Sequence, residues 1–120
     1  MADSSISKFF EKSLKERLGM VADFSDLSQN ELKIIEDATG GISYDEADSM
    51  IENAIGTFSL PLGIATNFRI NDRDYLIPMV IEEPSVIAAA SKDAKIARIH
   101  GGFKAKSEPV SYTHLRAHET

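Results

Sequence analysis

Two adjacent carboxylates, Glu82 and Glu83, stand where an apolar run gives way to a helix start at Pro84. A carboxyl group in such a place can serve as a general acid or base for a reacting oxygen. Burial between apolar segments favours the protonated form of a carboxyl group, whereas a nearby Lys favours the ionised form. The simpler alternative is that Glu83 only caps the following helix, because acidic residues are common at helix starts.

Ser85 directly follows Pro84, at the first turn of the same predicted helix. Free backbone N–H groups at a helix start suit an anion, so Ser85 is a candidate for binding one. The alternative is an ordinary first-turn Ser without a ligand.

The sequence lacks several kinds of site. It contains no Cys, which excludes disulfides and thiolate metal sites. The glycine pairs at residues 40–41 and 101–102 are predicted helix stops, and no glycine-rich dinucleotide fingerprint occurs. We therefore predict neither metal ligands nor cofactor-binding residues in this chain.

Composition narrows the class of protein. The 120 residues carry a net charge of -6 without a concentrated basic surface, which argues against nucleic acid as the main partner. No apolar run reaches the roughly 20 residues that a membrane span needs. The first ten residues do not form a secretory signal. We expect one domain, or a piece of one, in the cytoplasm and not in a membrane.

The apolar periodicity predicts an α+β chain with three short helices, a β-hairpin and a buried helix. Ser28 with Glu31, and Ser43 with Glu46, are capping-box patterns that predict two of the helix starts. Helices are expected over residues 4–20, 28–38, 43–56 and 86–99, and strands over residues 58–70 and 75–81.

Polar residues 71–74 separate the two strand-like runs and predict a hairpin turn. Pro61 and Pro78 interrupt the runs, so both strands are expected to be irregular or edge-like. The first half of residues 86–99 is apolar on every side, which is typical of a helix buried in a larger body.

The final stretch, residues 110–120, departs from this pattern. It resembles one reading frame of a DNA-sequencing adapter, so we interpret it as a non-native tail joined to residues 1–109. His114 and His118 lie in this tail and are excluded from any metal or catalytic role.

Residues 50–103 resemble class II 3-hydroxy-3-methylglutaryl-coenzyme A reductases, the bacterial and archaeal type. The order and spacing of several pieces carry the resemblance, and Glu82-Glu83-Pro84-Ser85-Val86 is the strongest of them. The other pieces are Glu52-Asn53-Ala54-Ile55-Gly56, Leu60-Pro61-Leu62-Gly63-Ile64-Ala65, Asn67-Phe68, Asp74-Tyr75-Leu76-Ile77-Pro78-Met79, Ala88-Ala89-Ala90-Ser91 and Ile99-His100-Gly101-Gly102-Phe103.

The resemblance implies an oxidoreductase that converts 3-hydroxy-3-methylglutaryl-CoA to mevalonate and coenzyme A in two hydride transfers from NADH or NADPH, or runs in reverse. It implies that Glu83 is the catalytic acid acting on the carbonyl oxygen. It also implies substrate-binding roles for Ser85, Glu52, Asn53 and Ser91.

The same resemblance makes residues 1–109 the first segment of the large, substrate-binding and dimerising domain. The complete enzyme is then expected to be a dimer or a trimer of dimers. The family's catalytic Lys, Asp and late His are absent from this sequence, as is the small domain that binds the nicotinamide. The chain alone is therefore expected to be an inactive fragment.

Three departures from the family pattern are visible. Family members often carry Val where this chain has Ala54 and Gly where it has Asp72. A basic residue that contacts coenzyme A in some relatives is replaced here by Phe10, so that contact is not carried over. Lys8, Lys12 or Lys15 are the candidates to substitute for it.

Two alternatives remain open from the sequence. One is a non-enzymatic α+β dimerisation or interaction module that kept the dimerising half of an ancestral reductase. The other is a helical regulatory protein, which would require residues 58–81 to be helical. Pro61 and Pro78 argue against that second alternative.

Overall fold

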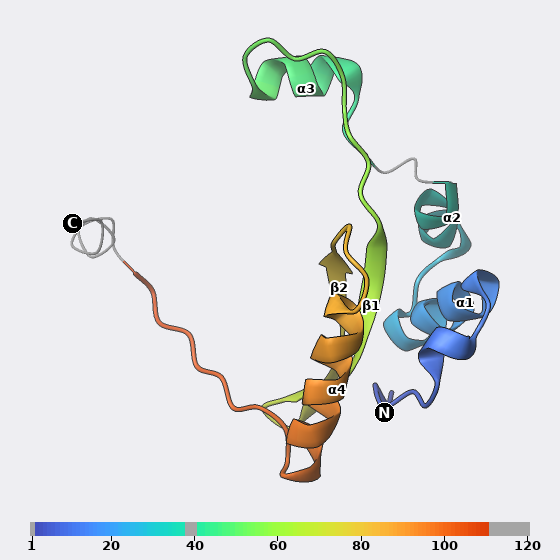
Figure 1. The fold of residues 1–120 in the computed structure, drawn as a ribbon, viewed down its shortest axis with the longest axis vertical. Coiled ribbons are helices and arrows are strands. Elements are labelled where there is room, and N and C mark those ends of the chain that lie inside the picture. The colour runs from blue at the N-terminus through green and yellow to red at the C-terminus, as the bar shows by residue number, and fades with distance from the viewer. Residues whose placement is uncertain (1, 38–40, 111–120) are drawn as a thin grey trace.

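The structure, a computed structural model, describes residues 2–37 and 41–110 (Figure 1). It is an α+β chain, as predicted, with helices before and after one antiparallel hairpin. The elements are η1 (Phe9–Glu11), α1 (Leu14–Ser25), α2 (Gln29–Asp37), α3 (Tyr44–Met50), β1 (Leu62–Ile70), β2 (Arg73–Val80) and α4 (Val86–Ile99). The predicted end of the second helix at Ala38, and the tail beyond Val110, lie outside the described residues.

Reciprocal capping boxes start the first three α-helices. The boxes predicted at Ser28 and Ser43 are both confirmed, with the Ser side chain and the Glu three residues later bonding each other's backbone N–H. A third box at Ser13 starts α1. The prediction of a helix over residues 4–20 was wrong, because this box sets the start at Leu14 and the helix continues through Gly19 to Ser25.

The third helix is shorter than predicted. It ends at Met50, and Ile51 already has extended backbone angles. The apolar residues after Met50, which suggested helix to residue 56, belong instead to an irregular arm that leads to β1. We call residues 51–61 the arm.

The hairpin turn is a two-residue connection. Asn71 and Asp72 both have positive φ, 49° and 66°, and Ile70 pairs with Arg73. This is the pattern of a type I′ turn, which Asn and Asp tolerate well. The predicted turn over residues 71–74 is therefore right only for its first half, because Arg73 and Asp74 belong to β2.

Both strands are edges, as expected, but only Pro78 lies within a strand: β1 begins at Leu62, after Pro61, and not at residue 58 as predicted. The sheet has two strands, and Pro78 pairs with Ile64 within it. The register shifts between Ala65 and Phe68, so β1 carries a bulge whose Asn67 has a φ of 71°.

Helix α4 has the predicted bounds and packs along β1 (Figure 1). Ala94 and Ala65 are fully buried in this contact. After the helix, Phe103 returns to the hairpin, where its N–H donates to Arg69 O and its ring stacks on Phe68 at 5.5 Å. One face of α4 is thereby fixed on the sheet.

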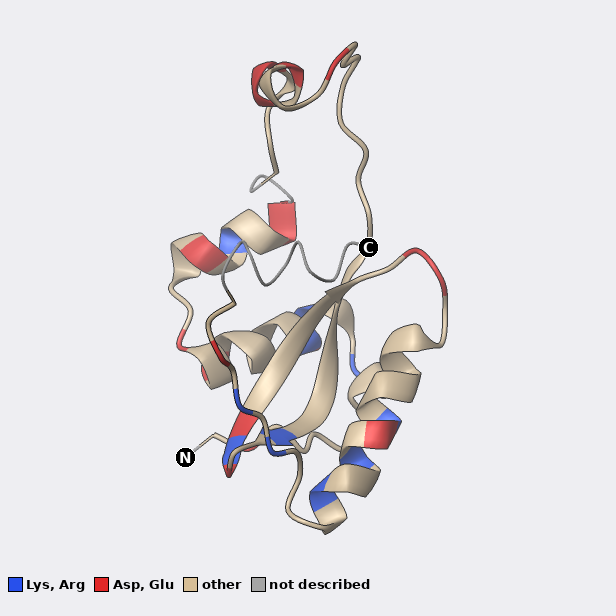
Figure 2. Cartoon of the chain, turned by 90° about the vertical axis from the view of Figure 1, so that its left-hand side faces the viewer, with Lys and Arg blue, Asp and Glu red and all other residues tan. Residues whose placement is uncertain are grey.

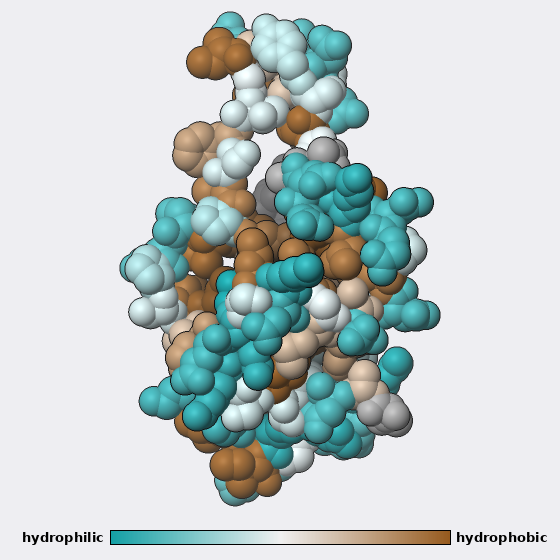
Figure 3. All heavy atoms as spheres, turned by 90° about the vertical axis from the view of Figure 1, so that its right-hand side faces the viewer, coloured by the Kyte–Doolittle hydropathy of each residue, from teal (hydrophilic) through white to brown (hydrophobic). Residues whose placement is uncertain are grey.

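The described residues bury few apolar side chains. Among residues 2–37 and 41–110, three hydrophobic residues are buried, namely Ala47, Ala65 and Ala94. The radius of gyration is 18.0 Å, against about 14 Å for a compact chain of this length. Figure 3 shows apolar side chains at the surface of both the projecting part and the body below it. Within these residues only one face of α4 is covered, and the burial predicted from its apolar first half refers to a larger body, so it stays a prediction.

Gly102 offers a test of how α4 is fastened to the hairpin. Its φ is +83°, and an added Cβ would overlap the backbone carbonyl oxygen of Arg69. Gly101 also has a positive φ, +94°, but an added Cβ there would meet nothing within 4 Å. We expect Gly102→Ala to lower the free energy of unfolding by roughly 1–3 kcal/mol more than Gly101→Ala, because only the first adds overlap to backbone strain. Denaturant unfolding of the two variants measures the difference, and equal losses would contradict it.

Candidate functional site

The predicted catalytic acid lies in the short connection between β2 and α4. Glu82 and Glu83 are both exposed there, in a bend that precedes Pro84. Figure 2 shows this acidic loop at the start of α4. The burial expected for Glu83 is not present in the described residues, because no other element covers the loop. Its side chain makes no hydrogen bond or ion pair within residues 2–37 and 41–110.

Ser85 is the residue before the first turn of α4. Its φ is 77°, a left-handed conformation, and its side chain makes no capping hydrogen bond to the helix. The first N–H groups of α4 therefore have no side-chain acceptor from Ser85. This local geometry leaves both the hydroxyl and the helix start exposed beside Glu83.

Glu52 and Asn53 lie elsewhere, at the beginning of the arm. Both are exposed, and Asn53 has a φ of 57° in a turn that follows α3. Figure 1 shows that α3, which precedes the arm, projects away from the hairpin. No hydrogen bond or ion pair between described residues joins Glu52 or Asn53 to the loop that carries Glu83. The structure thus does not bring the predicted substrate-binding residues into one group.

Ser91 is committed to contacts within the fold. Its hydroxyl accepts a hydrogen bond from Thr66 N at 3.0 Å and donates to Ile87 O at 2.9 Å. Its carbonyl oxygen accepts from the Asn67 side chain at 3.0 Å. Ser91 therefore fastens α4 to the bulge of β1, a contact that sequence reasoning did not predict.

The bulge also holds the N-terminal segment. Asn67 N donates to Ser4 O at 2.8 Å, while the neighbouring Thr66 N is taken by Ser91. A bulge removes its residues from the strand ladder, so their N–H groups are available to other partners. Here the two N–H groups connect β1 to α4 on one side and to the N-terminal segment on the other.

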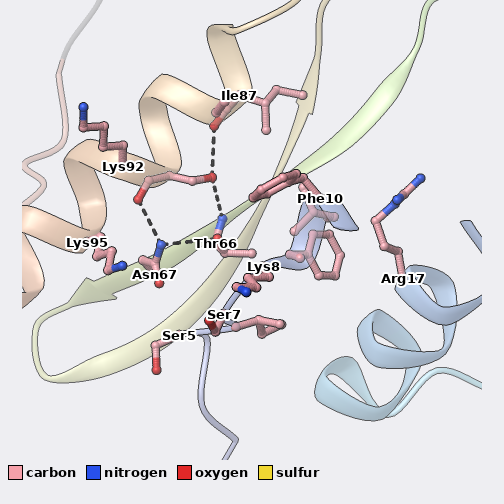
Figure 4. Close-up of a pocket in the computed structure, with 15 residues that line it drawn as sticks. Ser5, Ser7, Lys8, Phe10, Arg17, Thr66, Asn67, Ile87, Lys92 and Lys95 are labelled. Carbon is pink, nitrogen blue, oxygen red and sulfur yellow. Dashed lines mark hydrogen bonds between the residues drawn. The ribbon is translucent and has the colours of Figure 1, made fainter. Parts of the chain in front are cut away.

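A cleft of about 870 Å³ lies around this bulge. Residues 5–10, β1 and α4 line it, and its lining includes four basic residues, namely Lys8, Arg17, Lys92 and Lys95. In Figure 4, Lys8 and Lys95 lie beside Asn67 at the bulge, whereas Lys92 extends away from it and Arg17 lies on the far side of Phe10. Lys92 and Lys95 are exposed residues of α4 that line this cleft. None of the four forms an ion pair with a carboxylate of the described residues.

Asp74 forms a buried ion-pair cluster that the sequence reasoning missed. Its side chain is 5% exposed and accepts from Arg98 at 2.8 Å and from Arg69 at 2.9 Å. Hydrogen bonding to Arg98 holds the pKa of the Asp74 carboxyl well below its ordinary value, against the opposing effect of burial. The available signal was an Asp inside a strand, a position where this residue is depleted unless a partner compensates.

Comparison with known proteins now adds to this geometry. Residues 13–117 match the sequence model of the family described as hydroxymethylglutaryl-coenzyme A reductase. The chain belongs to the hydroxymethylglutaryl-coenzyme A reductase family. The matched range contains the site residues predicted from the sequence, Glu52, Asn53, Glu83, Ser85 and Ser91. It also extends past residue 109, so the boundary of the proposed tail stays a prediction.

Individual relatives agree with the family assignment. The chain is 58% identical over 100 residues to the 3-hydroxy-3-methylglutaryl-coenzyme A reductase of Archaeoglobus fulgidus, which covers 83% of this chain and 22% of that protein. The reductase structure from Streptococcus pneumoniae matches with a TM-score of 0.76 and 36% identity, over 87% of this chain and 24% of that one. A class II reductase from the same species, described as bound to NADPH in open conformations, matches with a TM-score of 0.74 and 39% identity, over 83% and 27% of the two chains.

The chain covers only part of the length of its relatives. The chain spans about a fifth to a quarter of the length of these reductases. Among residues 2–37 and 41–110, no helix combines the length and apolar character of a membrane span. Within the same described ranges, no group of three or more His, Asp or Glu side chains could hold a metal ion.

Proposed function

We propose that the complete protein is a hydroxymethylglutaryl-CoA reductase and that residues 1–109 are the first segment of its large, substrate-binding domain. The reaction is the two-step reduction of the thioester to mevalonate and coenzyme A, or its reverse, with NADH or NADPH. The observation that carries the proposal is the family match over residues 13–117, which includes the Glu83 loop. The 58% identity to an archaeal reductase supports it.

Glu83 is proposed as the acid that works on the substrate's carbonyl oxygen. Negative charge develops on that oxygen each time hydride adds, and a proton donor within hydrogen-bonding distance lowers the barrier. An exposed side chain in the loop before α4 is free to reach a ligand. A cation beside the carboxyl must come from polypeptide other than the described residues, because Glu83 forms no ion pair within them.

Ser85 is proposed to hold the substrate's terminal carboxylate. Its unbonded hydroxyl and the first N–H groups of the 14-residue helix α4 stand beside Glu83. A helix N-terminus favours a negative charge through its free N–H groups and its dipole. Substrate held there would have its carboxylate close to the loop that supplies the acid.

The basic cleft is proposed to take the phosphate groups of coenzyme A. A volume of about 870 Å³ falls within the range of ligand sites, roughly 300–1,000 Å³. Some relatives have a basic residue at the position of Phe10. Lys8 and Arg17 supply positive charge in its place, and Lys92 and Lys95 line the cleft from α4. Figure 2 shows basic residues around the hairpin and along the second half of α4, while acidic residues mark α2, α3 and the loop into α4. Ser91 then contributes by fixing the cleft wall.

The residues of this chain do not fit a nicotinamide dinucleotide. Among the described residues, Gly101 and Gly102 follow a helix, so they do not form the strand-to-helix turn that a dinucleotide-binding loop requires. Hydride donation is therefore assigned to no residue here, and NADPH is named only for the Streptococcus pneumoniae structure.

The arm is proposed as part of a homodimer interface, with Glu52 and Asn53 at its start. Its apolar side chains are unusually exposed, with Ile55 at 94% and Phe58 at 87%. Exposed apolar surface of this kind marks contacts with other polypeptide. The proposed assembly of the complete protein is a homodimer or a trimer of such dimers.

The same exposed arm is the observation that favours the second candidate, a non-enzymatic interaction module. The two are separated by reading the coding sequence past residue 107 and assaying the complete product for oxidation of NADH or NADPH that depends on hydroxymethylglutaryl-CoA. We expect a downstream Lys, Asp, His and nucleotide domain, and thioester-dependent oxidation. Their absence, with a 1–109 chain that is monomeric, cooperatively folded and unable to bind coenzyme A thioesters, would favour the module.

A further inference from the structure

Ser4 is the buried residue that anchors the N-terminal segment before η1 to the fold. Ser4 is fully buried, and each of its polar groups has a partner. Its N–H donates to Asp74 Oδ2 at 2.9 Å, and its hydroxyl donates to Phe68 O at 2.9 Å. Its carbonyl oxygen accepts from Asn67 N at 2.8 Å and from Ile6 N at 3.1 Å. An irregular segment near a chain terminus is usually loose unless it is tied down in this way.

The partner of Ser4 is itself held from α4. Asp74 is the second residue of β2, beside the hairpin turn, and Arg98 reaches it from the last turn of α4 at 2.8 Å. Arg98 also contacts Asp3 at 3.1 Å, and Arg69 of β1 completes the cluster at 2.9 Å. One carboxylate therefore joins three parts of the chain that are far apart in sequence, namely the N-terminal segment, the hairpin and α4.

The segment that Ser4 anchors continues directly into a wall of the basic cleft. Residues 5–10 form that wall, and Lys8 within it has a left-handed backbone, with a φ of 55°. The opposite side is α4, which carries Lys92 and Lys95. Since Arg98 belongs to the same helix as these lysines, the cluster fixes the spacing between the two sides of the cleft.

We propose that Asp74 is a positioning residue for ligand binding: with Ser4 and Arg98 it forms a latch that holds residues 5–10 as the cleft wall. The proposal rests on the proposed function in one respect, that the cleft takes the phosphates of coenzyme A. A free segment must be ordered when a ligand binds, and this entropic cost lowers affinity. A segment already held by the latch avoids that cost.

The latch is remote from the proposed chemistry. Arg98 lies twelve residues along α4 from Val86, which is about 18 Å at the helical rise. Loss of the latch is therefore expected to change the binding of coenzyme A and to leave the Glu83 loop unchanged. An effect on affinity without an effect on the first turn of α4 distinguishes positioning from general unfolding.

The test compares three variants of the 120-residue chain with the unaltered chain. Asp74→Asn removes the carboxylate charge, and Arg98→Gln breaks the latch from the helix side while leaving Arg69 on Asp74. Asp72→Asn is the matched control, because Asp72 is an exposed carboxylate two residues away whose ion-pair partner among the described residues is Lys104. Amide hydrogen exchange is followed at Ile6 and Asn67, whose N–H groups both donate to Ser4 O, and at Ala89 in α4. Coenzyme A affinity is measured by titration of the same samples.

Asp74→Asn and Arg98→Gln are expected to speed exchange at Ile6 and Asn67 by about tenfold or more, and to raise the Kd for coenzyme A by a similar factor. Exchange at Ala89 should stay slow, and Asp72→Asn should match the unaltered chain. Continued protection of both amides in Arg98→Gln, or coenzyme A affinity unchanged after the amides are released, overturns the latch alone. Failure of the unaltered chain to bind coenzyme A overturns the proposed use of the cleft and the positioning role together.

Discussion

Glu83→Gln in the complete protein is expected, under the proposed function, to lower kcat by about 10²–10⁴-fold while the KM for the thioester changes little. Gln has nearly the shape of Glu but no transferable proton, so substrate can still bind while the carbonyl oxygen loses its acid. Steady-state kinetics of hydroxymethylglutaryl-CoA reduction measures both constants. Glu83 is exposed and no described residue packs its carboxylate, so the substitution should leave the fold intact.

Glu82→Gln is the matched control for this substitution. It removes the same charge from the adjacent exposed position of the same loop. Activity close to that of the unaltered enzyme is expected, since only one of the two carboxylates is assigned to the carbonyl oxygen. Full activity in Glu83→Gln, or equal losses in both variants, would contradict the assignment.

The sequence predicted the helix ends and the turn that depend on residues close together in the chain. The boxes at Ser28 and Ser43, and the glycines after Ile99, set helix ends through contacts a few residues apart. The turn at Asn71 was identified for the same reason, because the residues that adopt its positive φ are part of the turn itself. These features depend little on the rest of the fold, so a single sequence reveals them.

Contacts between distant residues were not predictable in the same way. Ser4 and Asp74 are 70 residues apart, and nothing near either residue in sequence indicates the other. The apolar residues at positions 6, 9 and 10 have helical spacing, which suggested a helix from residue 4. The long-range bonds of Ser4 instead hold the segment in an irregular path, so tertiary contacts override the local pattern.

The candidate site likewise contains residues that local sequence predicts and residues that only long-range contacts bring together. Glu83 and Ser85 were identified because a contiguous motif carries them, and the structure keeps them on one loop. Lys8 and Lys95 share a cleft only because the bulge of β1 brings the N-terminal segment and α4 together. Asn67, whose backbone and side chain bond both of these elements, appeared in the sequence only as one letter of a family motif.

Charging the arm is expected to separate the proposed homodimer. The double substitution Ile55→Glu with Phe58→Glu replaces two apolar side chains that are 94% and 87% exposed in the single chain. Each such side chain contributes roughly 1.5–3 kcal/mol when it becomes buried. Both protomers carry the two substitutions, so four such side chains are lost, and the dimer dissociation constant should rise by about 10⁴-fold or more. Sedimentation of the complete protein across a range of concentrations measures the constant.

Thr57→Glu with Ser59→Glu is the control, because it adds the same two charges to the same arm without removing apolar surface. A much smaller effect from this pair would assign the loss to apolar contact and not to charge repulsion. The arm makes this distinction possible because its polar and apolar residues are interleaved and exposed along one extended segment. If the Ile55 and Phe58 variant assembles as tightly as the unaltered protein, the arm faces solvent in the assembly, and the apolar half of α4 becomes the next surface to test.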